Sequence, residues 1–259
     1  MRTAIFITVR TGSSRLPKKA LALVAGVPAI VYLIRRMRLA VKPTMIVLCT
    51  TDLPEDDVLC QIAKDEGIQF FRGSTHDKLI RWLGAATHFG IDFFVTADGD
   101  DLLCGHELID AALSMAEDDR IDFIQAPGIV CGAFTYGIRT RALQKVCEIK
   151  DSEDTEMMWV YFTETNLFNI RDLKGISSLY YGPDIRMTLD YPDDLNFFEK
   201  VIGYFESIGR PYTLKDVLVW LRANPEVAKI NLYLQDKFLE NQRQHTKLKI
   251  KGTEHDCTP

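Results

Sequence analysis

The sequence contains no run of about 20 uncharged apolar residues, so we expect no transmembrane helix and no membrane partner. Its first nine residues are mostly apolar, but Arg10 and the turn residues after it end that run before it reaches the length of a secretion signal. We therefore expect the protein to be cytoplasmic.

The sequence also lacks an excess of positive charge. It has 31 Lys and Arg residues against 36 Asp and Glu residues, which gives a formal net charge of −5. A protein that coats nucleic acid needs a basic surface to neutralise phosphates. We therefore expect no nucleic-acid partner, although this balance leaves room for a small basic pocket.

Several common motifs are missing as well. The six cysteines are scattered, none lies in C-x-x-C, and none has a histidine at zinc-finger spacing, so we expect reduced thiols rather than a zinc site. Neither G-x-x-x-x-G-K-[ST] nor G-x-G-x-x-G occurs, which excludes a Walker loop and a Rossmann turn.

The first half of the sequence alternates between short apolar runs and segments of helical period. The runs are rich in β-branched residues and predict buried strands at residues 3–9, 44–50, 68–71, 91–97 and 121–125. Helices are predicted between them at residues 28–39, 52–67, 74–88 and 106–117. This alternation implies right-handed crossovers and an α/β fold with a mostly parallel sheet.

The second half is less regular. It predicts short strands near residues 134–138 and 186–189, and helices at residues 154–162, 195–208, 213–222 and 228–243. Residues 246–259 are polar, so we expect a flexible tail there.

A basic loop follows the first predicted strand. Between Arg10 and Lys19 it carries four cations, two serine hydroxyls and Gly12. Guanidinium and ammonium groups bind phosphate oxygens, and a glycine-containing backbone can point its N–H groups at an anion. Ligands of parallel sheets bind beyond the carboxyl ends of the strands, which favours a phosphate site. A solvated basic loop is the simpler alternative.

An acidic turn follows the fourth predicted strand. It contains Asp98, Asp100 and Asp101, whose carboxylates suit Mg²⁺ bound together with substrate phosphates. An acidic turn that caps the next helix is the alternative. A basic loop and an acidic turn at neighbouring strand ends together are typical of a metal–nucleotide site.

Several separated motifs resemble the sugar cytidylyltransferases, which include the CMP-sialic acid and CMP-Kdo synthetases and the SpsF-like spore-coat proteins. The basic loop matches R-x-x-S-x-R-L-P-x-K and is followed by G-V-P at residues 26–28. T-T-D-L-P-E-D-D at 50–57 and R-G-S at 72–74 come next, with Asp77, Leu79 and Arg81 after them. L-D-Y-P-D-D-L at 189–195 resembles the family's L-D-x-P-E-D-L.

The resemblance implies a three-layer α/β/α sandwich of the nucleotide-diphospho-sugar transferase type. It implies one nucleotidyltransferase domain over residues 1–245, with a nucleotide-binding half at 1–125 and an acceptor-binding and helical part at 126–245. The sequence departs from the family at Asp101-Leu102, where Cys-Pro is usual, and at Met157, where related chains tend to have His. The first departure leaves open whether Asp98 or Asp101 shares the metal.

The resemblance also assigns site residues. It implies that Asp100 and Asp190 bind Mg²⁺ and that Arg15, Lys19 and Asp100 are catalytic. The candidate acceptor-binding residues are Arg81, Glu156 and Arg186. The candidate nucleotide-binding residues are Arg10, Thr11, Gly12, Ser13, Ser14, Arg15, Lys19, Arg72 and Asp98.

The expected reaction transfers CMP from CTP to a sugar, sugar acid or related small acceptor and releases pyrophosphate, for surface polysaccharide or glycoconjugate synthesis. A homodimer is expected. Three alternatives stay open: a nucleotidyltransferase that uses another nucleotide, a glycosyltransferase of the same fold that uses a nucleotide-sugar, and a non-catalytic nucleotide-binding protein.

Overall fold

The computed structural model describes residues 1–13 and 15–252. The predicted site residue Ser14 and residues 253–259 of the predicted tail lie outside the described residues. Among the described residues, no helix is both long and apolar enough to cross a membrane.

Seven strands form the main sheet, in the spatial order β5-β4-β1-β6-β8-β7-β9, and two short strands form a separate hairpin. The strands are β1 (Thr3–Thr8), β2 (Leu23–Val24), β3 (Val27–Pro28), β4 (Met45–Thr51), β5 (Gln69–Gly73), β6 (Phe93–Asp98), β7 (Phe123–Gln125), β8 (Gly137–Arg139) and β9 (Ile170–Asp172). In the main sheet β1, β4, β5 and β6 pair in parallel, β8 is antiparallel to β6 and β7, and β9 is parallel to β7.

Ten α-helices and three short 3₁₀ helices lie within the described residues. The α-helices are α1 (Ala29–Met37), α2 (Asp57–Asp65), α3 (Lys78–Phe89), α4 (His106–Met115), α5 (Thr140–Ile149), α6 (Val160–Thr163), α7 (Pro192–Ile208), α8 (Leu214–Ala223), α9 (Pro225–Leu232) and α10 (Gln235–His245). The 3₁₀ helices are η1 (Lys19–Leu21), η2 (Pro54–Asp56) and η3 (Ser178–Tyr180).

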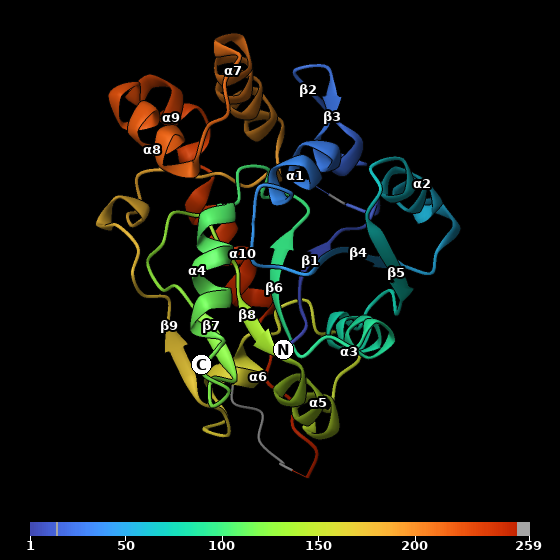
Figure 1. Cartoon of the computed structure of the whole chain (residues 1–259). Coiled ribbons are helices and arrows are strands. Elements are labelled where there is room, and N and C mark those ends of the chain that lie inside the picture. Colours follow the sequence, from blue (N-terminus) through green and yellow to red (C-terminus); the bar gives the residue numbers. More distant parts are fainter. Residues whose placement is uncertain (14, 253–259) are drawn as a thin grey trace.

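Helices cover both faces of the sheet, which confirms the predicted three-layer α/β/α fold. Along β1, Ile5 and Ile7 point into a core shared with α1, α2, α4 and α7–α9, whereas Ala4 and Phe6 point into a second core shared with α3, α5 and α6. This period-2 alternation on a strand buried from both sides is what a continuous apolar run predicts. Figure 1 shows α7–α9 gathered at one end of the molecule and α5 and α6 toward the other.

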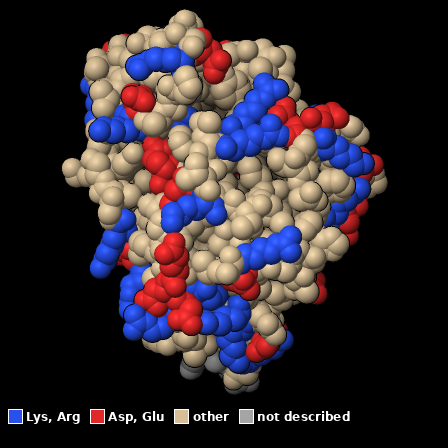
Figure 2. Space-filling model, in the orientation of Figure 1, with Lys and Arg blue, Asp and Glu red and all other residues tan. Residues whose placement is uncertain are grey.

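Charged side chains of both signs share the surface. Figure 2 shows Lys and Arg beside Asp and Glu in several places on the drawn face. This mixture follows from the near balance of 31 positive and 36 negative side chains.

The predicted helix at 154–162 is wrong over most of its length, because only α6 is helical there. Before α6, side chains form hydrogen bonds with nearby backbone groups. The Ser152 hydroxyl donates to the Asp154 carbonyl, and the Asp154 carboxylate accepts from the Glu156 N–H. Such bonds offer the backbone an alternative to a helix.

Two other second-half predictions also need correction. The strand at 186–189 is reduced to a bridge between Arg186 and Cys131. The single helix at 228–243 is two helices, α9 and α10, and the buried amide of Asn231 near the break donates to the Arg186 carbonyl and to Asp194. The β2–β3 hairpin and β9 were not predicted.

The described part of the predicted tail lies against the domain. Ile250 forms an antiparallel bridge with Lys150, next to the end of α5. The chain therefore returns to the segment that leads into residues 154–159.

Candidate active site

A cavity of about 780 Å³ opens beyond the carboxyl ends of β1 and β6. Its walls come from the basic loop, the acidic turn, residues 125–136, residues 154–159 and α10. The cavity therefore lies at the edge of the parallel sheet where the order of the strands predicts a ligand site.

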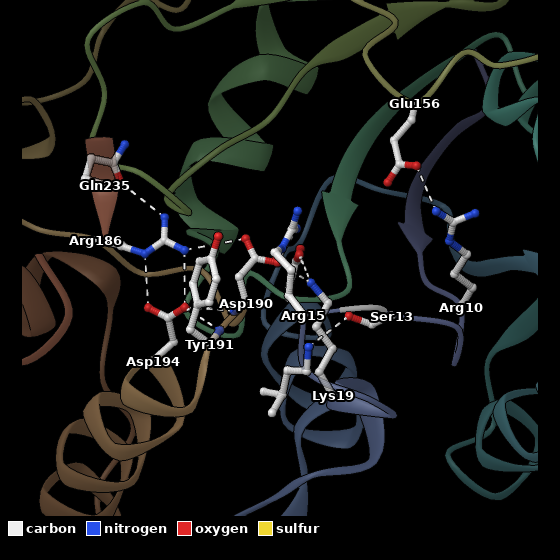
Figure 3. Close-up of polar contacts among 12 residues, drawn as sticks. Arg10, Ser13, Arg15, Lys19, Glu156, Arg186, Asp190, Tyr191, Asp194 and Gln235 are labelled. Atoms are coloured by element: carbon white, nitrogen blue, oxygen red, sulfur yellow. Dashed lines mark hydrogen bonds and ion pairs between the residues drawn. The ribbon is translucent and has the colours of Figure 1, made fainter. Parts of the chain in front are cut away.

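Lys19 joins the two predicted metal ligands at the centre of this cavity. Its Nζ donates to Asp100 Oδ2 at 2.5 Å and to Asp190 Oδ1 at 2.7 Å. Arg15 Nη2 donates to the same Asp190 oxygen at 2.6 Å, and Figure 3 shows this convergence. Two cations and two carboxylates from three distant parts of the sequence thus meet.

Backbone features hold these groups in place. Gly99 sits where β1 and β6 come close, and a Cβ there would lie 2.6 Å from the Val9 side chain. The Leu189 N–H donates to the Asp100 carbonyl at 2.9 Å, which ties the segment before Asp190 to the acidic turn. Asp194 then accepts from the backbone N–H of Asp190 at 2.8 Å and fixes the start of α7.

The charged side chains around Lys19 determine which of these groups are ionised. Burial raises the pKa of Asp190, but the charge of Lys19 and hydrogen bonds from Lys19 and Arg15 outweigh it and hold the pKa below its usual value. Burial lowers the pKa of Lys19, but the charges of Asp100 and Asp190 outweigh it and raise the pKa of the ammonium group. Both groups are therefore charged at neutral pH.

The donor set fits a magnesium ion bound together with phosphates. No group of three or more His, Cys, Asp or Glu side chains that could hold a metal occurs in the described part of the chain. Mg²⁺ needs only one or two protein carboxylates when substrate phosphates and water supply the other ligands. Asp100 and Asp190 already converge on one cation, the Lys19 ammonium group, which shows that their geometry accepts positive charge.

The predicted nucleotide-binding residues are partly brought together. Arg10, Gly12, Ser13 and Asp98 line the cavity, and Asp98 accepts from Lys78 at 3.1 Å. Ser13 Oγ accepts from the Leu16 N–H at 3.5 Å.

Thr11 and Arg72 lie outside the cavity wall. Asp56 accepts from both the N–H and the hydroxyl of Thr11 at 2.7 Å, so Thr11 anchors the loop. Arg72 contacts Asp57 and the carbonyls of Thr51 and Leu53, so it braces the end of β4.

The three candidate acceptor-binding residues have different places. Glu156 and Arg81 line the cavity, and Glu156 accepts from Arg10 at 2.8 Å, as Figure 3 shows. Arg186 does not reach the cavity: it is 0% exposed, and its Nε donates to Asp194 at 3.0 Å. Arg186 therefore stabilises the start of α7 through Asp194. The prediction that it contacts the acceptor is corrected, because its side chain does not line the cavity.

Several wall residues were missed by the sequence analysis. Lys78, Thr135, Phe238, Asn241 and Gln242 all line the cavity. The last three come from α10, where nothing in the local sequence signals a site. Asp56 lies in the T-T-D-L-P-E-D-D motif, which could have identified it as a loop anchor.

We expect Asp56→Asn to destabilise the protein in a pH-dependent way. Burial raises the pKa of Asp56, but hydrogen bonds from Thr51 and Thr11 outweigh it and lower the pKa. The carboxylate therefore adds stability above its unfolded pKa of about 3.9, and that stability is lost as pH falls through the lower folded value. The expected difference in free energy of unfolding from wild type is about 1–3 kcal/mol at pH 7 and shrinks as pH falls below about 4.

Urea unfolding at several pH values measures this difference. Asp65→Asn, on the surface at the end of α2, is the matched control. A difference for Asp56→Asn that stays constant from pH 7 to pH 3 would contradict the ionised anchor.

Comparison with known proteins places these features in one family. The family model described as Cytidylyltransferase matches residues 4–241. The spore coat polysaccharide biosynthesis protein SpsF of Bacillus subtilis is 22% identical over 231 residues, which cover 86% of this chain and 95% of that protein.

Two solved structures share the fold. A cytidylyltransferase from Leptospira borgpetersenii superposes with a TM-score of 0.78 at 24% identity, covering 88% of this chain and 97% of that one. A CMP:2-keto-3-deoxy-manno-octonic acid synthetase complexed with CTP superposes with a TM-score of 0.61 at 17% identity, covering 79% of this chain and 100% of that one.

Proposed function

The chain belongs to the cytidylyltransferase family, a family of CTP-dependent nucleotidyltransferases, and from this premise we propose that it transfers CMP from CTP to a small carbohydrate acceptor and releases pyrophosphate. The convergence of Lys19, Arg15, Asp100 and Asp190 beyond two neighbouring strand ends carries the proposal. The likeness to SpsF favours an acceptor used in surface polysaccharide or glycoconjugate synthesis. The homodimer and the cytoplasmic location stay predictions.

The residues of the basic loop would bind the triphosphate. Arg10, Arg15 and Lys19 each pair with a carboxylate and would exchange it for phosphate oxygens. The acceptor hydroxyl attacks the α-phosphorus, a new O–P bond forms, and the bond to the bridging oxygen of the β-phosphate breaks. The hydroxyl proton leaves to solvent, and Arg15 and Lys19 would neutralise the departing pyrophosphate.

The family generally uses a divalent metal, and Asp100 and Asp190 would hold it here. When bound, Mg²⁺ would supply further positive charge to the α- and β-phosphates. The protein itself would contribute positioning and electrostatic stabilisation rather than a covalent intermediate.

We expect CTP with Mg²⁺ to raise the Tm of the protein. A ligand present at about one hundred times its Kd stabilises by about 2.7 kcal/mol. That free energy corresponds to a shift of roughly 5–10 °C for a domain of this size. Thermal unfolding with CTP, UTP, ATP and GTP, each with and without Mg²⁺, measures the shift.

The four nucleotides distinguish the alternatives. A Tm shift with CTP that depends on Mg²⁺ supports cytidylyl transfer. A Tm shift with another nucleotide instead would mean that this nucleotide, and not CTP, is the donor. No shift with any of the four in folded protein would contradict the proposed function and favour a nucleotide-sugar or a scaffold role.

A further inference from the structure

Two contacts from different segments of the chain hold Arg10 at the cavity wall. Its Nη1 donates to the Thr75 carbonyl at 3.4 Å, and its Nη2 donates to Glu156 Oε2 at 2.8 Å, the contact that Figure 3 shows. Thr75 lies just before α3, whereas Glu156 belongs to the wall segment 154–159. The place of the Arg10 guanidinium therefore depends on how these two segments are fixed to each other.

The Thr155 side chain joins the two segments. Its hydroxyl donates to Asp77 Oδ1 at 2.9 Å and accepts from the Leu79 N–H at 3.1 Å. The Thr155 N–H also donates to the His76 carbonyl at 3.5 Å. Thr155 is only 1% exposed, so water does not compete for these hydrogen bonds. The wall segment is thus attached to the start of α3.

Asp77 also forms a buried ion pair with Lys150. The Lys150 ammonium group donates to Asp77 Oδ2 and, at 2.7 Å, to the Ser152 carbonyl. Asp77 Oδ1 accepts from the Ile80 N–H at 3.1 Å as well, which caps α3. A buried charge is tolerated when it is paired and hydrogen-bonded, and both groups meet these conditions. The ion pair therefore fixes α3 against the stretch that leads into residues 154–159.

The backbone on either side of Lys150 is held by the C-terminal stretch. The Asp151 N–H donates to the Lys249 carbonyl at 2.8 Å, and the Lys251 N–H donates to the Ile149 carbonyl at 2.8 Å. These two hydrogen bonds accompany the antiparallel bridge described above. The main chain that carries the lysine is therefore fixed as well as its side chain.

Asp77, Thr155 and Lys150 together form what we call the Asp77 cluster. We propose that the Asp77 cluster positions Arg10 for the triphosphate, an inference that rests on the proposed cytidylyl transfer. None of the three residues lines the cavity, so they act through the two contacts of Arg10. Phosphate would replace the Glu156 carboxylate, while the backbone carbonyl keeps its contact with the guanidinium. An arginine that is already fixed loses less rotamer freedom when it binds phosphate, so pre-organisation strengthens binding.

Calorimetric titration of the full-length protein with CTP and Mg²⁺ tests this role. Thr155→Val keeps the shape of the side chain but removes the hydroxyl, and we expect it to raise the Kd for CTP at least about threefold. Thr155→Ser keeps the hydroxyl and should bring the Kd back to within about 1.5-fold of the wild-type value. A Kd that is unchanged or lower in Thr155→Val, or a loss of affinity in Thr155→Ser as large as in Thr155→Val, would overturn the inference.

Thr3→Val is the matched control. Thr3 is also buried, and its hydroxyl donates to the Lys42 carbonyl at 3.2 Å. It begins β1, whereas the basic loop follows the other end of that strand. The same substitution should therefore leave the Kd for CTP unchanged, and a rise equal to that of Thr155→Val would contradict a specific role of the Asp77 cluster.

An Arg10→Met background distinguishes positioning from a general loss of structure. If the Asp77 cluster acts through Arg10, Thr155→Val should change the Kd less than about 1.5-fold in this background, because the group that it positions is gone. A purely structural defect would weaken CTP binding equally with and without Arg10, and that result would overturn the inference.

The same titrations separate this inference from the proposed function. Absence of CTP binding by the wild-type protein would contradict cytidylyl transfer itself, and the inference would fall with it. Binding of CTP by the wild-type protein that Thr155→Val leaves unchanged would keep the transferase and overturn only the positioning role.

Discussion

Lys19→Ala should lower kcat/KM at least about a hundredfold, which corresponds to about 2.7 kcal/mol of transition-state stabilisation. Lys19 bridges Asp100 and Asp190 and would neutralise the departing pyrophosphate. Its loss removes the cation that pairs with Asp100, whereas Asp190 keeps its contacts with Arg15 and Arg186. Asp100→Ala is expected to cost at least about as much, because it removes half of the proposed metal site. Steady-state pyrophosphate release measures both variants.

Lys18→Ala is the control for the charge. Lys18 precedes Lys19 in the same loop, but it is exposed and is not part of the cavity wall. Its removal takes the same charge from the loop and should change kcat/KM less than about threefold, in keeping with the weak effect of solvated charges. Near-normal turnover in Lys19→Ala, or an equal loss in Lys18→Ala, would contradict the assigned role.

Arg186→Met is expected to lower the free energy of unfolding by about 3–5 kcal/mol. Arg186, Asp190 and Asp194 are all fully buried, and Arg186 is the cation that pairs with Asp194. Methionine keeps much of the volume of the side chain but leaves a buried carboxylate without its cation. Urea unfolding at neutral pH measures the loss.

The control for this variant is an exposed pair. Arg35 binds Glu66 at 2.8 Å with 58% of its side chain exposed, so Arg35→Met should cost no more than about 1 kcal/mol. If Arg186→Met were as stable as Arg35→Met but bound acceptor poorly, the structural role of Arg186 would be wrong and the role first predicted for it would return.

The first half of the fold could be predicted because its elements carry their own signals. The strands β1, β4 and β6 are apolar runs bounded by turn residues. A central strand that is buried on both faces is apolar along its whole length, so its own composition identifies it. Short elements at the edge of the sheet give weaker signals. The strand β9 has only three residues, two of them exposed, and its place depends on pairing with β7 rather than on its own composition.

The centre of the site could be predicted for a similar reason. Charged loops at the carboxyl ends of neighbouring parallel strands lie close together, so the order of the elements predicted that the basic loop and the acidic turn share one site. The family resemblance then singled out Lys19 and Asp100 within these two segments. Arg186 shows where this reasoning fails. Whether an arginine faces a cavity or a buried carboxylate depends on Asp194, Asn231 and Gln235, which other turns of the chain bring to it. The place of α10 in the cavity wall could not be predicted either, because it also depends on long-range packing.

The cavity takes its walls from opposite ends of the described chain, and this has a consequence for how the protein is made. A ribosome releases the basic loop early, whereas α10 leaves last among the segments that line the cavity. A nascent chain can therefore present the groups that are proposed to bind the triphosphate long before it has the helix that completes the cavity wall. Turnover would begin only when synthesis is nearly complete, so prematurely terminated chains would not form the product.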